Sequence, residues 1–401
     1  MRVLLVHDYG TATGGAENMV LLLRDRLRAR GHEVCLFTST ARPLDVPVLA
    51  DETCLGTTSG FRTLLQSANP WAARRLGALV RSFRPDVVFV RMLLTQLSPL
   101  ILPALRAVPA VYNVADYRPI CPTGTRWLPR GGPCHHRVGV ACAREGCVPL
   151  RDWPPLMAQM ALWGRWRRVF DRVVVASEWM RERLGVEGLV ADAVVPNGVP
   201  PRPARAPLDG PPAVAFAGRL VPAKGLHVLL AAMARVRDEI PDARLLVAGD
   251  GPARADLERA AQQAGLGDAV TWLGHVGRDA LEATLAPAWV HAVPSVWDEP
   301  FGIVAAEALM RGTAAVVSRS GGLAEIVEDG VTGRTVPPSD VAALAAALRD
   351  TLGDRECAER LGHAGRARAL ATYSDDVYVD RMLDQMRRAR VTRAARAPLT
   401  R

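Results

Sequence analysis

The 401-residue sequence contains no apolar run of about 18 residues, the length that a membrane-crossing helix needs, and only 5% of its residues are aromatic. Its apolar start, Met1–Val6, is interrupted by His7 and Asp8, and no small-residue cleavage site follows. A first buried strand explains this start better than a signal peptide does. We therefore expect a cytoplasmic protein without a membrane span.

The chain also lacks a general excess of basic residues. Its formal charge of +9 comes from 50 Lys+Arg and 41 Asp+Glu, but six arginines lie among the last fifteen residues, which contain no acid. Nine minus six leaves about +3 for the rest, too little for a nucleic-acid-binding surface. We expect no nucleic-acid partner. The arginine tail either stays solvated or contacts an anionic membrane.

Two short motifs are missing as well. No Asp-x-Asp triplet, the usual metal-holding signal, occurs in the chain, so we expect chemistry that needs no metal. The loop after the first predicted strand reads Gly10-Thr-Ala-Thr-Gly14-Gly15 and not Gly-x-Gly-x-x-Gly. This departs from the dinucleotide-binding pattern and disfavours an oxidoreductase built on Rossmann domains.

The residues that are present repeat one pattern twice. A glycine loop and a helix over 16–30 follow the first strand, and the pattern restarts near residue 211 with a strand, a glycine loop and a helix over 226–237. The predicted strands are 2–7, 33–38, 85–90, 108–114, 213–216, 243–248, 271–273, 290–293 and 314–317. Strands that alternate with helices predict an α/β protein with doubly wound parallel sheets, here in two Rossmann-like domains.

We expect the domains to span residues 1–200 and 201–375, with a C-terminal helix and basic tail over 376–401 that packs back on the first domain. Ligands of such sheets bind at the carboxyl ends of the strands, where loops meet helix N-termini. A central cleft between the two domains is therefore the expected site.

The loop after the strand 290–293 contains the sharpest signal. Glu299 precedes Pro300, which we place in the first turn of a helix that carries Glu307. Free amides at a positive helix end suit phosphate or sugar oxygens. Glu307 is set among alanines, where a carboxylate is unusual unless it accepts hydrogen bonds, for example from a ribose diol.

A second loop adds two cations to this picture. Arg219 and Lys224 lie between Gly218 and Gly225, in a turn that joins a strand to a helix. A guanidinium binds a phosphate through two parallel hydrogen bonds and an ammonium acts as a point charge, so together they suit a diphosphate.

Further motifs recur in a fixed order. They are Gly14-Gly15-Ala16-Glu17, Pro196-Asn197-Gly198-Val199, Gly218-Arg219, Lys224-Gly225, Gly249-Asp250-Gly251-Pro252, Gly274-His275, Pro294-Ser295, Glu299-Pro300-Phe301-Gly302, Glu307-Ala308, Gly321-Gly322-Leu323-Ala324-Glu325, Asp329-Gly330, Gly333 and Pro337. This series resembles the retaining glycosyltransferases of family 4, which have the GT-B fold. The resemblance spans most of the chain and is dense from 214 to 340.

The resemblance implies transfer of a sugar from a nucleotide-diphosphate sugar, UDP-linked by preference, to a hydroxyl acceptor in glycan, glycolipid or natural-product synthesis. Arg219, Lys224 and Glu299 would be catalytic: the two cations would hold the diphosphate and Glu299 the sugar hydroxyls. The implied donor-binding residues are Gly15, Gly218, Gly274, Val276, Phe301, Gly302, Ile303 and Glu307. The nucleotide sugar is a substrate, and no cofactor is required.

This constellation is chemically coherent without a metal. Cleavage of a glycosyl–phosphate bond builds negative charge on the leaving diphosphate, which fixed cations and helix amides would stabilise. Retention without an enzymatic nucleophile would imply front-face attack, with the leaving phosphate taking the acceptor's proton.

One first-half motif departs from the family. The family often has His immediately before Asp116, where this chain has Ala115. Asn113 or Asp116 would take over part of that residue's role on the acceptor or donor-sugar side. The departure keeps open an alternative: a catalytically weak or non-catalytic GT-B protein that binds a sugar nucleotide or a membrane.

Two segments have open interpretations. Cys121, Cys134, Cys142 and Cys147 lie in the loop 116–150, and a structural zinc site, a disulfide pair and free thiols are the three alternatives, since no Cys-x-x-Cys occurs. The helical run 153–168 combines tryptophans with arginines. It either packs on its own domain or makes a peripheral contact with an anionic membrane or a lipid-linked acceptor.

Overall fold

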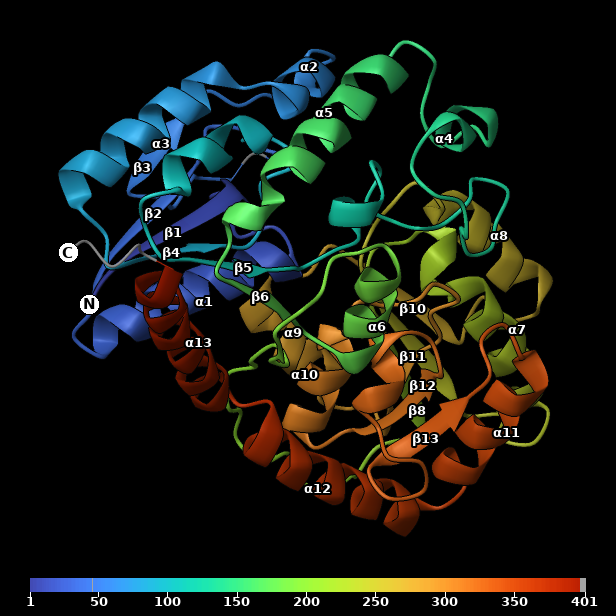
Figure 1. Ribbon diagram of the computed structural model, residues 1–401. Coiled ribbons are helices and arrows are strands. Elements are labelled where there is room, and N and C mark those ends of the chain that lie inside the picture. Colours follow the sequence, from blue (N-terminus) through green and yellow to red (C-terminus); the bar gives the residue numbers. More distant parts are fainter. Residues whose placement is uncertain (45, 397–401) are drawn as a thin grey trace. The chain divides into compact units, whose positions relative to one another are not determined.

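The computed structural model describes residues 1–44 and 46–396 and divides into two units (Figure 1). Unit 1 contains Met1–Gly198 and the chain from Asp375 onward, and unit 2 contains Val199–Ser374. The divisions at 198/199 and 374/375 lie within two residues of the expected boundaries. The chain thus leaves unit 1, forms unit 2, and returns to unit 1.

Unit 1 is built on a parallel sheet of seven strands in the order β3-β2-β1-β4-β5-β6-β7. Its central strands are buried along almost their whole length because helices cover both faces. The strands are β1 (Arg2–Tyr9), β2 (Glu33–Ser39), β3 (Glu52–Cys54), β4 (Val87–Val90), β5 (Ala110–Asn113), β6 (Arg172–Val175) and β7 (Ala193–Val194).

Helices of unit 1 pack on both faces of that sheet. On one face α1 and α13 lie side by side, and α13 contacts β4, β5 and β6; on the other, α3 and α5 pack against η1 (Figure 1). The helices are α1 (Gly15–Ala29), α2 (Arg62–Ser67), α3 (Pro70–Phe83), η1 (Pro99–Leu105), η2 (Arg118–Ile120), α4 (Val140–Arg144), α5 (Trp153–Trp166), η3 (Arg167–Val169), α6 (Glu178–Val186) and α13 (Asp375–Arg396).

Unit 2 repeats the architecture with six parallel strands in the order β10-β9-β8-β11-β12-β13. The strands are β8 (Ala213–Ala217), β9 (Arg244–Ala248), β10 (Val270–Gly274), β11 (Val290–Val293), β12 (Ala314–Ser318) and β13 (Gly333–Val336). The helices are η4 (Pro222–Lys224), α7 (Leu226–Arg237), α8 (Arg254–Gln263), α9 (Arg278–Leu285), α10 (Ile303–Arg311), η5 (Gly322–Glu325), α11 (Val341–Leu352) and α12 (Arg355–Thr372).

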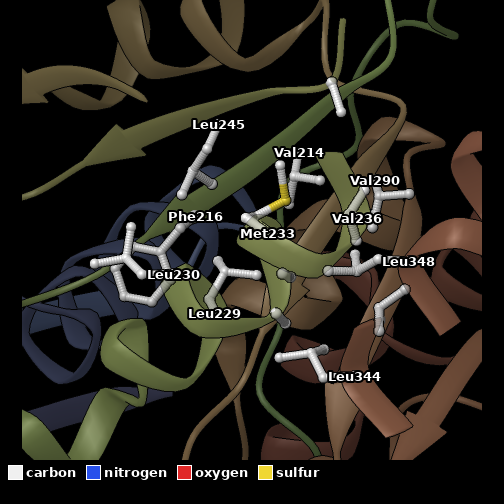
Figure 2. Packing of buried hydrophobic residues seen from close by; sticks show 14 of the residues in the cluster. Val214, Phe216, Leu229, Leu230, Met233, Val236, Leu245, Val290, Leu344 and Leu348 are labelled. Carbon is white, nitrogen blue, oxygen red and sulfur yellow. The ribbon is translucent and has the colours of Figure 1, made fainter. Parts of the chain in front are cut away.

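The main core of unit 2 lies between its sheet and the helices α7 and α11 (Figure 2). Leu229, Leu230 and Met233 of α7 meet strand residues such as Phe216, and Leu344 and Leu348 of α11 close the cluster. Their spacing along α7 is the three-to-four-residue period of a helix that buries one face. This packing holds the ends of the strands, and therefore the loops that follow them, in place.

The expected α/β class with two Rossmann-like sheets is confirmed. One local expectation is wrong: α10 begins at Ile303 with Gly302 as its N-cap, so Pro300 precedes the helix and is not in its first turn. Gly302 has φ 104, and a Cβ there would lie 2.6 Å from Leu323 Cδ1. The left-handed glycine, which the sequence pattern does not reveal, sets the start of the helix. In the described residues none of the helices has the length and hydropathy needed to cross a membrane.

The contact of α12 with α10 and β12 depends on a glycine. A Cβ at Gly362 would lie 2.2 Å from the carbonyl oxygen of Gly312, whereas a Cβ at Gly164 in α5 would meet nothing within 4 Å. We predict that Gly362→Ala lowers the free energy of unfolding by about 1–3 kcal/mol, and that the matched Gly164→Ala leaves it unchanged or raises it by up to about 1 kcal/mol. Urea unfolding of both variants measures this, and equal effects would contradict the packing described.

Each sheet also contains one fully buried histidine. Burial, with a contribution from Arg91, lowers the pKa of His7 to about 3, and burial, with a contribution from Arg311, lowers that of His291 to about 3. The ordinary histidine pKa of 6.5 applies to the unfolded chain, so the unfolded state binds these protons more readily. Their contribution to stability is therefore present above about pH 6.5 and is lost as the pH falls towards 3.

We predict that His291→Leu flattens the decline in the free energy of unfolding between pH 6.5 and about 4.5, because the titrating group is removed. Urea unfolding across this pH range is the measurement. His363→Gln, at an exposed position of α12, serves as the control and should keep the wild-type slope. An unchanged slope in His291→Leu would contradict the prediction.

Candidate functional site

Two loops of unit 2 meet where its strand order reverses. The strands β8 and β11 are neighbours in the sheet although two strands separate them in sequence. Their connections run to opposite sides, which opens a crevice at the carboxyl ends of this pair. The loop after β8 carries Lys224 and the loop after β11 carries Glu299. Two residues 75 positions apart are therefore brought to the same point.

Lys224 and Glu299 form an ion pair in this crevice. The Nζ of Lys224 lies 2.6 Å from Oε1 of Glu299, and their side chains are 29% and 8% exposed. The close approach of the two loops depends on Gly225, whose φ is +71 and whose Cβ, if present, would lie 1.9 Å from the carbonyl oxygen of Pro294. The glycine lets the backbone that follows Lys224 press directly against the β11 loop.

Glu299 is held from three directions. Its Oε1 also accepts a hydrogen bond from Ser295 Oγ at 2.6 Å, and its backbone carbonyl accepts one from Gly322 N at 2.8 Å. Its backbone forms a parallel bridge with Gly321, where a Cβ would lie 2.3 Å from the Glu299 carbonyl oxygen. The carboxylate therefore has a defined orientation before any ligand arrives.

Trp297 completes the environment of the cation and was missed by the sequence analysis. The Nζ of Lys224 lies 5.3 Å from the centroid of the Trp297 ring, within the range of a cation–π contact. Ser320 Oγ donates to the Trp297 carbonyl at 2.6 Å, which fixes the loop from the β12 side. A tryptophan two residues before Glu299 is the signal that could have pointed to it.

Composition holds a second missed signal. Lys224 is the only lysine in the chain, and the rest of the 50 Lys+Arg residues are arginines. Lysine and arginine differ because an ammonium is a compact point charge, whereas a guanidinium is a planar fork. A chain that uses arginine everywhere else and lysine once indicates that this position requires the compact cation.

The N-terminus of α10 adjoins Glu299 along the chain. In the described part of the protein no side chain caps α10 at Gly302, and the first intrahelical bond is donated by Ala305 N to the Gly302 carbonyl at 2.9 Å. The amides of Ile303 and Val304 precede that bond at the positive end of the helix. The ring of Phe301 is buried against Tyr373, with centroids 5.8 Å apart, so only its backbone is placed for a ligand. Glu307 follows one turn into the helix and is half-buried.

The remaining predicted residues of unit 2 lie on the same edge. Arg219 is exposed, and no hydrogen bond or ion pair engages its guanidinium within the described residues. Gly218 and Gly274 flank the end of β9: Gly218 N donates to the Ala248 carbonyl at 3.0 Å, and Gly249 N to the Gly274 carbonyl at 2.7 Å. Val276 packs partly on the small cluster around Ala215.

In unit 1 the equivalent loop follows β1 and ends at Gly15, the first residue of α1. The N-cap is Gly14, which offers no side-chain cap, and a Cβ there would lie 2.5 Å from Glu17 Oε2. Burial raises the pKa of the Glu17 carboxyl. This helix end is thus already faced by one of the protein's own carboxyl groups.

Asn113 belongs to a buried network of unit 1. It is 1% exposed, and its Oδ1 accepts from Arg91 Nη1, while Arg91 Nη2 donates to Asn197 Oδ1 at 2.9 Å. Its side chain is therefore committed inside the unit and, in this arrangement, is not available to a ligand.

Asp116, the other residue expected on the acceptor side, is partly exposed. Its Oδ1 accepts from Arg118 N at 3.0 Å, and its Oδ2 lies 3.5 Å from Arg118 Nε, with side-chain exposures of 27% and 21%. Burial raises the pKa of the Asp116 carboxyl, and Arg118 opposes that shift. Asp116 is thus the one of the two candidates that retains accessible surface.

Cys121, Cys134, Cys142 and Cys147 line one cavity of about 20 Å³ in unit 1. All four are free thiols. Within residues 1–44 and 46–396, no three His, Cys, Asp or Glu side chains are arranged to hold a metal ion as they stand. The structure therefore brings the four cysteines together and contains no disulfide among them.

The helix α5 directs its apolar residues inward. Leu156 and Trp163 are buried, and Trp163 Nε1 donates to the Pro119 carbonyl at 3.1 Å. In the arginine tail, Arg393 and Arg396 pair with the buried Asp171. The contacts of Leu156 and Trp163 show that α5 packs its apolar face on its own domain, so that face is not available to a membrane.

Comparisons with known proteins agree along most of the chain. The family model described as Glycosyltransferase Family 4 matches residues 13–202, and the one described as Glycosyl transferases group 1 matches residues 202–368. A glycogen synthase of Mycobacterium tuberculosis is 38% identical over 213 residues, and a phosphatidyl-myo-inositol mannosyltransferase of Mycolicibacterium smegmatis is 37% identical over 212. The chain spans about half the length of these curated relatives, 51% and 52%, and the matches cover 51% and 50% of the chain.

Solved structures match over nearly the whole chain. A sucrose-phosphate synthase from Thermosynechococcus elongatus has a TM-score of 0.72 at 25% identity and covers 96% of this chain and 98% of its own. Anabaena HepE, solved with UDP and glucose, has a TM-score of 0.70 at 19% identity over 96% and 99% of the two chains. The two family models follow one another from residue 13 to 368, and the fold agrees, so the chain belongs to the group 1, family 4 glycosyltransferases with the GT-B fold.

Proposed function

We propose that this protein transfers a sugar from a nucleotide-diphosphate sugar, UDP-linked by preference, to a hydroxyl acceptor with retention of configuration. The observation that carries the proposal is the contact of Lys224 with Glu299 at the switch point of the second sheet. It sets a cation for the diphosphate directly beside a carboxylate for the sugar hydroxyls. The family is consistent with this reaction, and Anabaena HepE was solved with UDP and glucose.

In our proposal, positive groups of the protein compensate the charge of the diphosphate without a metal ion. Lys224, the exposed Arg219 and the uncapped N-terminus of α10 lie on loops and a helix end at one edge of the sheet. In the reaction negative charge grows on the leaving diphosphate, and preorganised positive groups lower the energy of that state more than that of the bound donor. In our proposal these three groups take the role that a divalent cation has in other transferases.

Glu299 would switch partners when the donor binds. In the ligand-free chain its Oε1 accepts from both Lys224 and Ser295. A bound diphosphate attracts the ammonium, and the carboxylate then accepts hydrogen bonds from sugar hydroxyls. The donor diphosphate, departing with the nucleotide, would take the proton of the acceptor hydroxyl as that oxygen attacks the same face of the sugar.

A second candidate is a sugar-nucleotide-binding protein without turnover. The observation that favours it is Ala115, which stands where the family often has a histidine. The carboxylate of the neighbouring Asp116 is paired with Arg118, so it does not stand free to take the role of the missing histidine. Turnover and binding therefore have to be measured separately.

Peripheral contact with a membrane would involve the amino edge of β5 and β6 in unit 1. A cavity of about 300 Å³ there is lined by five arginines, Arg106, Arg165, Arg168, Arg393 and Arg396. Asp171 pairs with two of them, Arg393 and Arg396, and its one negative charge offsets one of the five positive charges. Five minus one leaves a net positive face, which is the feature that attracts anionic lipid.

We predict that Lys224→Ala and Glu299→Gln each lower the rate of nucleotide release from the accepted donor by about 100-fold or more. The assay offers purified protein a panel of UDP-sugars and GDP-mannose and measures free UDP or GDP. Arg259→Ala, on the exposed face of α8, is the control and should keep wild-type turnover. Turnover of Lys224→Ala within threefold of wild type would contradict the proposed role of that residue.

Donor binding can be followed apart from turnover because Lys224 carries the only side-chain amine. We predict that an amine-acylating reagent labels only Met1 and Lys224, and that UDP slows the labelling of Lys224 while leaving Met1 unchanged. Peptide mass spectrometry against time is the readout, with Met1 as the internal control. Protection by UDP without nucleotide release from any donor would favour the binding protein over the enzyme; no protection would contradict the proposed diphosphate site.

A further inference from the structure

The segment 121–147 of unit 1 holds its shape with little buried core. It connects the loop after β5 to α5, and its regular structure is limited to α4 and a bridge between Trp127 and Pro133. No residue from 129 to 147 is buried. A stretch of this length without apolar burial does not compensate the conformational entropy lost on ordering. Some other interaction must therefore order it.

The four cysteines of this segment converge on one small cavity. Cys121, Cys134, Cys142 and Cys147 line a space of about 20 Å³, close to the room that one water-sized species occupies. They come from points spread along the whole segment, so an ion bound there would tie all of it together.

The other polar groups at the cavity are already engaged. Glu145 lies 3.0 Å from Arg130 Nη2 and 3.4 Å from His136 Nε2. Arg126, only 6% exposed, donates from Nη1 to the His136 carbonyl, and its Nε is buried without a partner in the described structure. Arg126 Nη2 is paired with Glu187 Oε1 at 3.3 Å. Its unused N–H is suited to neighbour a negatively charged centre.

We propose that Cys121, Cys134, Cys142 and Cys147 bind one Zn²⁺ as four thiolates. As the side chains stand they are not in ligating positions, so the thiols must turn into the cavity they line. Four thiols then release four protons, four Zn–S bonds form, and the centre carries a charge of −2 that Arg126 partly offsets. No oxidant or reductant takes part.

Such a site is structural and leaves no coordination position open for a substrate. Its position matters because the segment follows Arg118, whose Nη1 donates to the Pro122 carbonyl at 3.0 Å and whose Nε lies 3.5 Å from Asp116. The ion would therefore fix the chain immediately after the only accessible residue that we expect on the acceptor side. The zinc proposal itself does not depend on the proposed function.

The direct test is the zinc content of the full-length protein, purified under reducing conditions without chelator and measured by inductively coupled plasma mass spectrometry. We expect about one zinc per chain. Cys134→Ser and Cys147→Ser should each lower this at least fivefold. Cys357→Ser, in α12 of unit 2 and remote from the segment, is the matched control and should keep the wild-type content.

A second measurement covers the case in which the cysteine variants fail to fold. Arg130, Arg137 and Arg144 are exposed in the segment. Removal of the metal from the wild-type protein should speed tryptic cleavage after these arginines, and added Zn²⁺ should restore protection. Replacement by Co²⁺ should give the visible absorption of a tetrahedral thiolate centre.

Two results would overturn the proposal. One is wild-type protein that contains no metal and takes up neither Zn²⁺ nor Co²⁺ after reduction. The other is an intact mass lower by two hydrogens per bridge together with loss of the cysteines' alkylation, which would show disulfides in their place. Neither readout involves sugar transfer, so failure here is distinguishable from failure of the proposed enzymatic activity.

Discussion

The ion pair between Lys224 and Glu299 depends on one topological fact, the reversal of strand order between β8 and β11. Only where neighbouring strands send their connections to opposite sides do two loops face each other with no helix between them. At Gly225 the loops after β8 and β11 come so close that a Cβ would lie 1.9 Å from the Pro294 carbonyl oxygen. At Gly321 the loop after β12 approaches the β11 loop in the same way, and a Cβ would lie 2.3 Å from the Glu299 carbonyl oxygen. The cation and the carboxylate are thus positioned by glycines and strand order more than by their own attraction.

Unit 1 has the same kind of reversal, between β1 and β4, and uses it differently. There Asp8, fully buried, accepts the amides of Thr95, Gln96 and Leu97 at 2.7–2.9 Å, and Arg91 is fixed by two asparagines. These contacts fill the switch point with the protein's own groups. In unit 2 the corresponding place presents an exposed arginine, a half-exposed lysine and a free helix end. The same architecture therefore gives a closed, structural edge in one unit and a ligand-ready edge in the other.

Much of the fold follows from local patterns. Helix α7 spans the predicted residues 226–237, and strands such as β11 and β2 lie within a residue of their predictions, because fully buried strands read as apolar runs between glycine loops. The short edge strands β3 and β7 were not predicted, nor were β6 and β13. Two or three residues that pair on one side carry no periodicity of their own. The start of α10 was placed too early because proline favours a first turn, whereas the left-handed Gly302 decides it.

The sequence by itself determined the class of fold, the order of the motifs and the residue types that a diphosphate and a sugar need, because these are encoded in composition and short spacings. The sequence also contains a single lysine, Lys224, whose importance was not recognised from the sequence. Only the tertiary structure decided that Lys224 contacts Glu299 beside Trp297, that Asn113 is occupied by Arg91, and that four scattered cysteines share one cavity. Each of these joins residues far apart along the chain, and such contacts are set by strand order and loop closure, which no local pattern contains.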